Sequence, residues 1–283
     1  MRKSSRTAIG VAAVRAAHQL VDAEPRVLDD PVILRLLGIG TLDTIREDRE
    51  RYQTPAALAL RSHVVMRSRY AEDRLAQAVA RGVGVTQYVI LGAGLDTFPY
   101  RQPAWARNLR IVEIDRAPMQ REKRERLSLA HVLVPDNVTF GAIDFESEAL
   151  GDALRRYGVD ATQPTVFSWL GVTMYLTEKA VLDVLRVVAG FPSRSEITFT
   201  FAPSASGNTP ADDAMARFAE LAASQGEPWR TYFDPDELAA KVRALGFSHV
   251  ELLDLEEAAR RYFVGRNDGL PPPRRRSIMS AIV

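Results

Sequence analysis

Two glycines after an apolar run are the first residues whose spacing suggests chemistry. Gly92, Ala93 and Gly94 follow residues 88–91, a run typical of a buried strand. Such a turn lets the backbone approach a ligand at the edge where open α/β sheets bind nucleotides, although an ordinary strand-to-helix turn would also explain it. The dinucleotide fingerprint needs a third glycine where this chain has Thr97. The pattern therefore favours an adenosine ligand without a pyrophosphate, such as S-adenosylmethionine.

An acid follows the second predicted strand, expected at 109–114. Asp115 stands at its tip, where a carboxylate can accept hydrogen bonds from ribose hydroxyls. Glu113 has the same side-chain parity and is the alternative. The sequence leaves open the alternative that Asp115 is a surface carboxylate beside Arg116 and binds no ligand.

A carboxylate and an aromatic residue follow the third predicted strand, expected at 138–140. Asp144 can accept from the amino group of an adenine, and Phe145 can pack on its ring. Asp144 could equally be the N-cap of a helix predicted at 146–157. The three strand ends carry, in chain order, Gly-x-Gly, an acid and Asp-Phe. Together they predict an adenosine site more specifically than any one of them does alone.

The elements that must position these residues alternate between strands and helices. Residues 4–82 are expected to be mostly helical, with Asp30 and Pro31 starting one helix and another running from about 55 to 81. Further strands are expected at 165–169, 197–201 and 249–253, and further helices at about 117–130, 178–190, 211–225 and 235–245. This alternation predicts an α/β fold, a parallel sheet with helices on both faces. The run 271–276 is interpreted as a linker or turn.

Composition narrows the possible functions. The 283 residues include 37 basic and 36 acidic side chains, so the net charge of +1 gives no electrostatic argument for a nucleic-acid partner. The absence of cysteine excludes disulfides and cysteine-based zinc sites, and no metal-ligand cluster is visible. No run approaches the roughly 18 apolar residues of a membrane span, and the start of the chain lacks a signal-peptide pattern. We expect a soluble, cytoplasmic protein.

Residues 91–101, with the sequence Leu-Gly-Ala-Gly-Leu-Asp-Thr-Phe-Pro-Tyr-Arg, resemble the signature of the leucine carboxyl methyltransferase family. They are most similar to its bacterial branch of S-adenosylmethionine-dependent methyltransferases, which is common in actinobacteria. Other agreeing stretches are 5–8, 15–18, 29–31, 67–70, 171–177 and 261–270. The resemblance implies one class I methyltransferase (Rossmann-like) domain over 1–283, with a helical cap at 1–82, an α/β core at 87–283 and an insertion near 202–233.

The resemblance also implies a cofactor site. Arg67 would bind the carboxylate of the methionine part of S-adenosylmethionine, and Gly92 would contact the same part. Asp115 would bind the ribose, and Asp144 with Phe145 the adenine. A guanidinium can pair bidentately with a carboxylate, although the residues alone favour a solvated helix face for Arg67.

The acceptor is less defined than the methyl donor. Candidate substrate-binding residues are Tyr100, Arg101, Tyr175, Trp229 and Tyr232. Arg101 could hold an anion or form a salt bridge within the fold. The function expected is O-methylation of a small-molecule carboxylate or hydroxyl, and no general base is assigned, since a carboxylate acceptor needs none.

Two alternatives stay open at this point. Leu170 stands where many relatives have a glutamate, so the chain could be a catalytically silent member that binds the cofactor or acts structurally. An NAD-dependent oxidoreductase is disfavoured by Thr97 and by the lack of a Tyr-x-x-x-Lys set. The sequence does not identify the acceptor or the oligomeric state.

Overall fold

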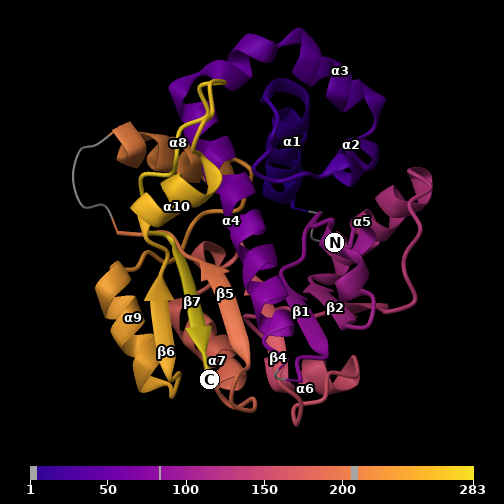
Figure 1. Cartoon of the computed structure of the whole chain (residues 1–283), viewed down its shortest axis with the longest axis vertical. Coiled ribbons are helices and arrows are strands. Elements are labelled where there is room, and N and C mark those ends of the chain that lie inside the picture. Colours follow the sequence, from indigo (N-terminus) through magenta and orange to yellow (C-terminus); the bar gives the residue numbers. More distant parts are fainter. Residues whose placement is uncertain (1–4, 83, 205–209) are drawn as a thin grey trace.

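A seven-stranded sheet forms the centre of the molecule (Figure 1). The computed structural model describes residues 5–82, 84–204 and 210–283. The strand order is β3-β2-β1-β4-β5-β7-β6, and only β7 runs antiparallel to its neighbours. The strands are β1 Gln87–Leu91, β2 Arg110–Asp115, β3 Val138–Ala142, β4 Thr165–Trp169, β5 Glu196–Thr200, β6 His249–Leu252 and β7 Ile278–Ile282. The carboxyl ends of β1, β2 and β4 therefore lie side by side.

Helices cover both faces of this sheet because its central strands are buried throughout. The long helix α4, Pro55–Ala80, lies along one face, where Leu75 and Ala78 pack on alternate residues of β1 and β2. Helices α6, α7 and α9 pack on the other face. The helices of the core are α5 Ala117–Leu129, α6 Leu150–Arg156, α7 Glu178–Ala189, α8 Pro210–Ser224, α9 Pro235–Ala244 and α10 Leu255–Tyr262.

A helical cap stands over the carboxyl ends of the strands, at the top of Figure 1. It consists of α1 Arg6–Val21, α2 Pro31–Leu37, α3 Ile39–Glu47 and the first half of α4. Helix α2 begins as its sequence indicates: the Asp30 carboxylate accepts from the Ile33 N–H at 3.3 Å, and Pro31 occupies the first position. Buried apolar residues of α1, α2 and α3 form a separate core that also contacts Leu95 and Met119 of the Rossmann-like part.

Most predicted elements are confirmed to within a few residues, but three predictions of local structure are wrong. Strand β7 was not expected, and it makes the sheet mixed; its central Ser280 interrupts the apolar run. Helix α10 was also not expected. The helix predicted from residue 146 begins at Leu150, because residues 144–149 form a turn held by Asp144.

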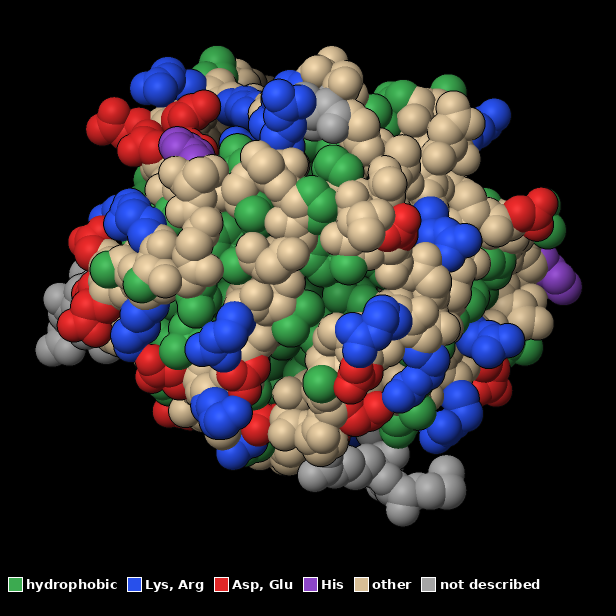
Figure 2. Space-filling model, turned by 90° about the horizontal axis from the view of Figure 1, so that it is seen from below, with side chains coloured by type: hydrophobic (Ala, Val, Ile, Leu, Met, Phe, Trp, Pro, Cys, Tyr) green, Lys and Arg blue, Asp and Glu red, His purple; other side chains and the backbone are tan. Residues whose placement is uncertain are grey.

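The predicted cap 1–82 and insertion 202–233 include residues 1–4 and 205–209, which lie outside the described residues. Across the described ranges, no helix is long and apolar enough to cross a membrane. The face opposite the cap, where the parallel strands begin, is seen in Figure 2. There, basic and acidic side chains are interspersed around hydrophobic ones.

Candidate cofactor and acceptor site

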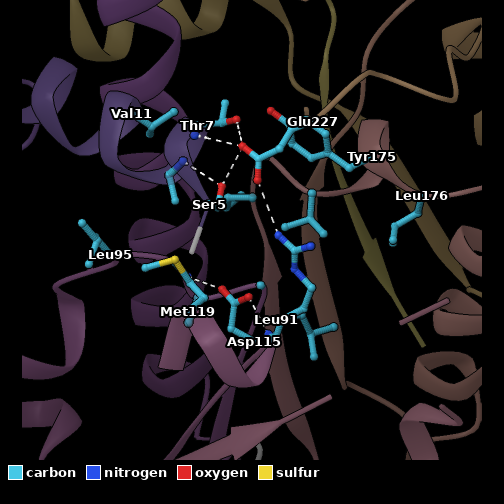
Figure 3. A pocket seen from close by; sticks show the side chains of 18 of the residues that line it. Ser5, Thr7, Val11, Leu91, Leu95, Asp115, Met119, Tyr175, Leu176 and Glu227 are labelled. Carbon is cyan, nitrogen blue, oxygen red and sulfur yellow. Dashed lines mark hydrogen bonds and ion pairs between the residues drawn. The ribbon is translucent and has the colours of Figure 1, made fainter. Parts of the chain in front are cut away.

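A cavity of about 1080 Å³ lies between the carboxyl ends of the strands and the cap (Figure 3). Its floor comes from the turn after β1, the tip of β2 and the segment after β3. Its roof comes from the start of α1 and from residues 224–228, at the end of α8 and directly after it. In Figure 3, Glu227 and Thr7 of the roof lie across the cavity from Asp115 and Met119. A volume at the upper end of the range for ligand pockets leaves room for more than one small molecule.

The glycine turn after β1 requires its glycines. Gly92 has φ +64°, and a Cβ added to it would lie 2.2 Å from Cγ2 of Val172. Gly94 has φ +47° and donates its N–H to Asp115 Oδ2 at 2.7 Å. Ala93 donates to the Ile114 carbonyl oxygen at 3.0 Å. The turn is therefore held against the end of β2 by its own backbone, and all three of its residues line the cavity.

Asp115 and Glu113 project to the same side of β2, but the structure separates them. The half-buried Asp115 lines the cavity and also accepts from the Arg116 N–H at 2.6 Å; burial raises the pKa of its carboxyl. Glu113 is fully buried, binds Lys123 Nζ at 2.5 Å, and does not line the cavity. Asp115 is thus the acid that a ligand in the cavity can reach.

Arg67 lies in the cavity wall, brought there by α4. Its guanidinium occupies the space beside Gly171, where a Cβ would lie 2.9 Å from both terminal nitrogens. Its Nε is buried without a hydrogen-bond partner, and within the described part of the chain the guanidinium forms no ion pair. Burial lowers the pKa of Arg67 to about 10, and the positive charge of Arg15 contributes to that. A half-buried cation without an anionic partner favours an anionic ligand.

Asp144 and Phe145 both line the cavity after β3. Asp144 Oδ1 accepts from the Glu146 N–H at 3.1 Å, so the residue closes a turn rather than capping α6, whose N-cap is Ala149. The ring of Phe145 is 9% exposed and packs against Trp169, with 5.9 Å between the ring centroids. One edge of this buried pair therefore reaches the cavity surface.

Of the five acceptor candidates, the structure brings only Tyr175 to the cavity. Burial raises the pKa of its hydroxyl. The Tyr100 hydroxyl instead donates to Glu113 Oε2 at 2.7 Å, behind the cavity floor. The Arg101 guanidinium is ion-paired with Glu72, so Arg101 forms the salt bridge within the fold that the sequence left open.

Trp229 and Tyr232 lie behind the roof of the cavity. Trp229 packs between Phe218 of α8 and Tyr232, with centroid distances of 5.8 Å and 5.9 Å. Tyr232 is 49% exposed, and neither residue lines the cavity. The rings of Phe218, Trp229 and Tyr232 thus support the roof segment, and Trp229 and Tyr232 do not line the cavity.

Sequence reasoning missed Glu227, which joins three parts of the roof and floor. Its Oε2 accepts from the Thr7 N–H at 3.0 Å, the Ser5 hydroxyl at 3.0 Å and the Thr7 hydroxyl. Its Oε1 lies 3.5 Å from Arg116 Nη2. No local pattern indicates this role, because the partners lie more than 100 residues away in the chain.

Asp96 was also missed, although it belongs to the Gly-x-Gly segment. It lines the cavity, and its Oδ1 accepts from the Phe98 N–H at 2.8 Å. Its negative charge counteracts the effect of burial on the pKa of Arg67, and both side chains line the cavity. Its position two residues after Gly94 is the signal that could have found it.

The wall beyond the glycine turn is apolar. Leu170, Val172 and Leu176 line it together with Tyr175. Leu170, at the position where the family resemblance implied a glutamate, is therefore a cavity residue, and it adds an apolar side chain to this wall.

No histidine and no metal ligand was assigned to the site from the sequence. Among the described residues, the cavity lining contains no histidine and no cluster of side chains able to hold a metal ion. His18 is fully buried in α1, with Nδ1 2.7 Å from Asp22 Oδ2. His63 lies on α4, and burial together with the charges of Arg67 and Arg275 lowers its pKa to about 3.

Comparisons with known proteins agree with this geometry. The profile of the leucine carboxyl methyltransferase family matches residues 8–189. Two similar proteins are each named "Putative S-adenosyl-L-methionine-dependent methyltransferase". YktD of Bacillus subtilis is 29% identical, covering 95% of both chains, and a Frankia alni protein is 32% identical, covering 64% of this chain and 63% of its own.

Among solved structures, a "putative O-methyltransferase" from Nostoc punctiforme superimposes with a TM-score of 0.50 at 13% identity, over 80% of this chain and 60% of that one. With the strand order above, this likeness confirms the class I methyltransferase fold.

Proposed function

This chain belongs to the leucine carboxyl methyltransferase family, and on that premise we propose that it transfers a methyl group from S-adenosylmethionine to an oxygen of a small molecule. Family membership and the named relatives make it an S-adenosylmethionine-dependent methyltransferase. The proposal goes further in naming the acceptor atom, the acceptor size and the residues that bind the cofactor. The observation that carries it is the half-buried Arg67, whose buried Nε has no hydrogen-bond partner, in the same cavity as the Gly92 turn and Asp115.

The chemistry of the cavity wall fits this cofactor. Arg67 would pair with the carboxylate of the methionine part, which would satisfy the orphaned Nε. Asp96 offers a carboxylate to the ammonium of the same part, and the Gly92 turn offers a backbone surface without side chains. Asp115 would accept from the ribose hydroxyls, and Asp144 with Phe145 would bind the adenine.

When bound, the cofactor supplies an electrophilic methyl group on a sulfonium. The residues of the chain then have to hold the acceptor at near-attack distance and exclude water, and positioning of this kind lowers the barrier by several kcal/mol. Leu170, Val172 and Tyr175 would form the apolar part of the acceptor wall. An acceptor carboxylate is ionised already, so the wall need not supply a base for it.

Calorimetric titration tests the cofactor assignment. We expect S-adenosylmethionine to bind and NAD not to bind. Transfer of labelled methyl to panels of small carboxylic acids, alcohols and phenols then tests the acceptor, and we expect labelled ester or ether products.

Three results would contradict the proposal. Absence of binding would remove the cofactor site. Binding without transfer to any panel member would favour the silent alternative, for which Leu170 in the cavity wall is the supporting observation. Labelling of phenols at a ring carbon only, with no ester or ether product, would exclude O-methylation.

A further inference from the structure

A second arginine, Arg15 of α1, connects the cap to the glycine segment. It is 5% exposed and lines the cavity. Its Nη1 donates to the Leu95 carbonyl oxygen at 3.1 Å, and its Nη2 donates to the Thr97 hydroxyl at 2.7 Å. One side chain from the cap thus holds two points of the segment that follows the Gly92 turn.

The Thr97 hydroxyl is the centre of a saturated polar network. It donates to Asp30 Oδ1 at 2.6 Å and accepts from Arg15 and from Arg101 Nε, the latter at 3.1 Å. A hydroxyl has one donor and two acceptor sites, so its capacity is used completely. Asp30 is itself ion-paired with Arg15. The charges of Arg15 and Arg101 outweigh the effect of burial and lower the pKa of the Asp30 carboxyl. Thr97 therefore has one defined position relative to the cap.

The cap adds support on the far side of the turn, beyond the contacts of Ala93 and Gly94 with the end of β2. Gly92 and Gly94 have positive φ angles and no side chains to pack, so the free turn would sample many conformations. Fixing Leu95 and Thr97 from the cap removes that freedom before a ligand arrives, and preorganisation of this kind raises affinity.

We propose that Arg15 is a positioning residue of the cofactor site: by fixing Leu95 and Thr97 it holds the Gly92 turn in its binding conformation. The cap then takes part in cofactor affinity and is more than a cover over the acceptor. This inference rests on the proposed function, because it assigns the affinity of the same cavity to a residue of the cap.

Arg61 provides a matched control within the cap. It is 1% exposed and bidentate to Asp22, at 2.7 Å and 2.8 Å, and it also donates to the Tyr52 carbonyl oxygen at 2.6 Å. It neither lines the cavity nor contacts the glycine segment. Both arginines are buried ion-paired residues of the cap, and they differ in whether they reach Leu95 and Thr97.

The experiment compares Arg15→Lys with Arg61→Lys in the full chain. Lysine keeps the charge but cannot span two acceptors as a guanidinium does. We measure S-adenosylhomocysteine affinity by calorimetry, melting temperature, and hydrogen exchange of peptides that cover 88–100 in the ligand-free protein. We expect Arg15→Lys to weaken binding at least fivefold and to speed exchange in 88–100. Arg61→Lys should lower the melting temperature while its affinity stays within twofold of the parent protein.

Other outcomes would overturn the inference or its premise separately. Unchanged affinity in Arg15→Lys, or equal losses in both variants, would sink the positioning role. If the parent protein does not bind S-adenosylhomocysteine, the proposed function fails, and the exchange of 88–100 still decides whether Arg15 orders the turn. If Arg15→Lys does not fold, Thr97→Val, which removes the hydroxyl at nearly constant shape, must show the same loss, with Thr97→Ser as its control.

Discussion

The two walls of the cavity are built in different ways. The sheet wall consists of residues at the ends of β1, β2 and β3, in chain order: the Gly92 turn, Asp115 and Asp144. The cap wall joins residues far apart in the chain, such as Thr7 and Glu227.

In the sheet wall, the Asp115 carboxylate is held by neighbouring backbone N–H groups. Arg67, which α4 brings into the cavity, has an Nε without a hydrogen-bond partner. In the cap wall, the Glu227 carboxylate already accepts several hydrogen bonds. Under the proposed function, we therefore expect the sheet wall and Arg67 to bind the cofactor and Glu227 to hold the cap in place.

The largest effect is expected from Arg67→Met. Charge-assisted hydrogen bonds to a buried carboxylate contribute about 1.5–3 kcal/mol, so affinity for S-adenosylmethionine should fall about 100-fold. Calorimetric titration measures it. Arg69→Met is the control, since Arg69 lies two residues along α4 but is exposed and paired with Asp73. Equal losses in both variants would contradict a specific role for Arg67.

We expect the protonation of His63 to change the free energy of unfolding by up to about 2 kcal/mol. Its pKa is about 3 in the folded protein and near 6.5 in the unfolded chain, so between these values the unfolded state binds the extra proton. Stability should therefore fall as the pH is lowered from 7 to 5. Denaturant unfolding at both pH values should show a smaller loss in His63→Gln than in the parent protein. The same loss in both would show that His63 is not the group that titrates.

Asp115→Asn should weaken cofactor binding about tenfold, because the amide has one acceptor oxygen for the N–H groups of Gly94 and Arg116 and loses the charge that strengthens hydrogen bonds from hydroxyls. Glu113→Gln is the internal comparison. It would leave Lys123 buried without its anion, so the melting temperature should drop while affinity stays the same. The reverse result would return the ribose contact to Glu113.

The smallest effect is expected in the cap wall. Glu227→Gln weakens the hydrogen bonds to Ser5 and Thr7 at the start of α1, where a negative charge is favourable. We expect S-adenosylhomocysteine to dissociate about threefold faster, as seen in stopped-flow release, with Glu220→Gln of α8 unchanged. A loss as large as that of Arg67→Met would erase the distinction between the walls.

The sequence predicts the fold well where local pattern and tertiary position agree. Parallel strands such as β1 and β4 are short, mostly apolar runs that are buried throughout, and α4 carries a long periodic pattern, so these elements follow from the residues. Strand β7 was missed because its place between β5 and β6 depends on pairing with distant residues.

The residues of the candidate site were likewise predictable only where the local pattern and the tertiary position agree. Gly92, Asp115 and Asp144 follow strands whose carboxyl ends meet by topology, so they could be placed in one cavity beforehand. Tyr100 and Arg101 follow the same strand end but turn into the fold, where Glu113 and Glu72 bind them. Glu227 needed the packing of α8 and α1, which no sequence pattern indicates.

Strand β7 has a consequence for the order in which the chain assembles. It follows every other strand in the sequence, yet it lies between β5 and β6 and supplies both of them with backbone partners. During synthesis on the ribosome, β5 must therefore wait as an open edge, and β6 without a neighbour, until residues 278–282 emerge. The glycine turn and its strand partners β2 and β4 are complete much earlier, so the cofactor half of the domain can form before the sheet closes.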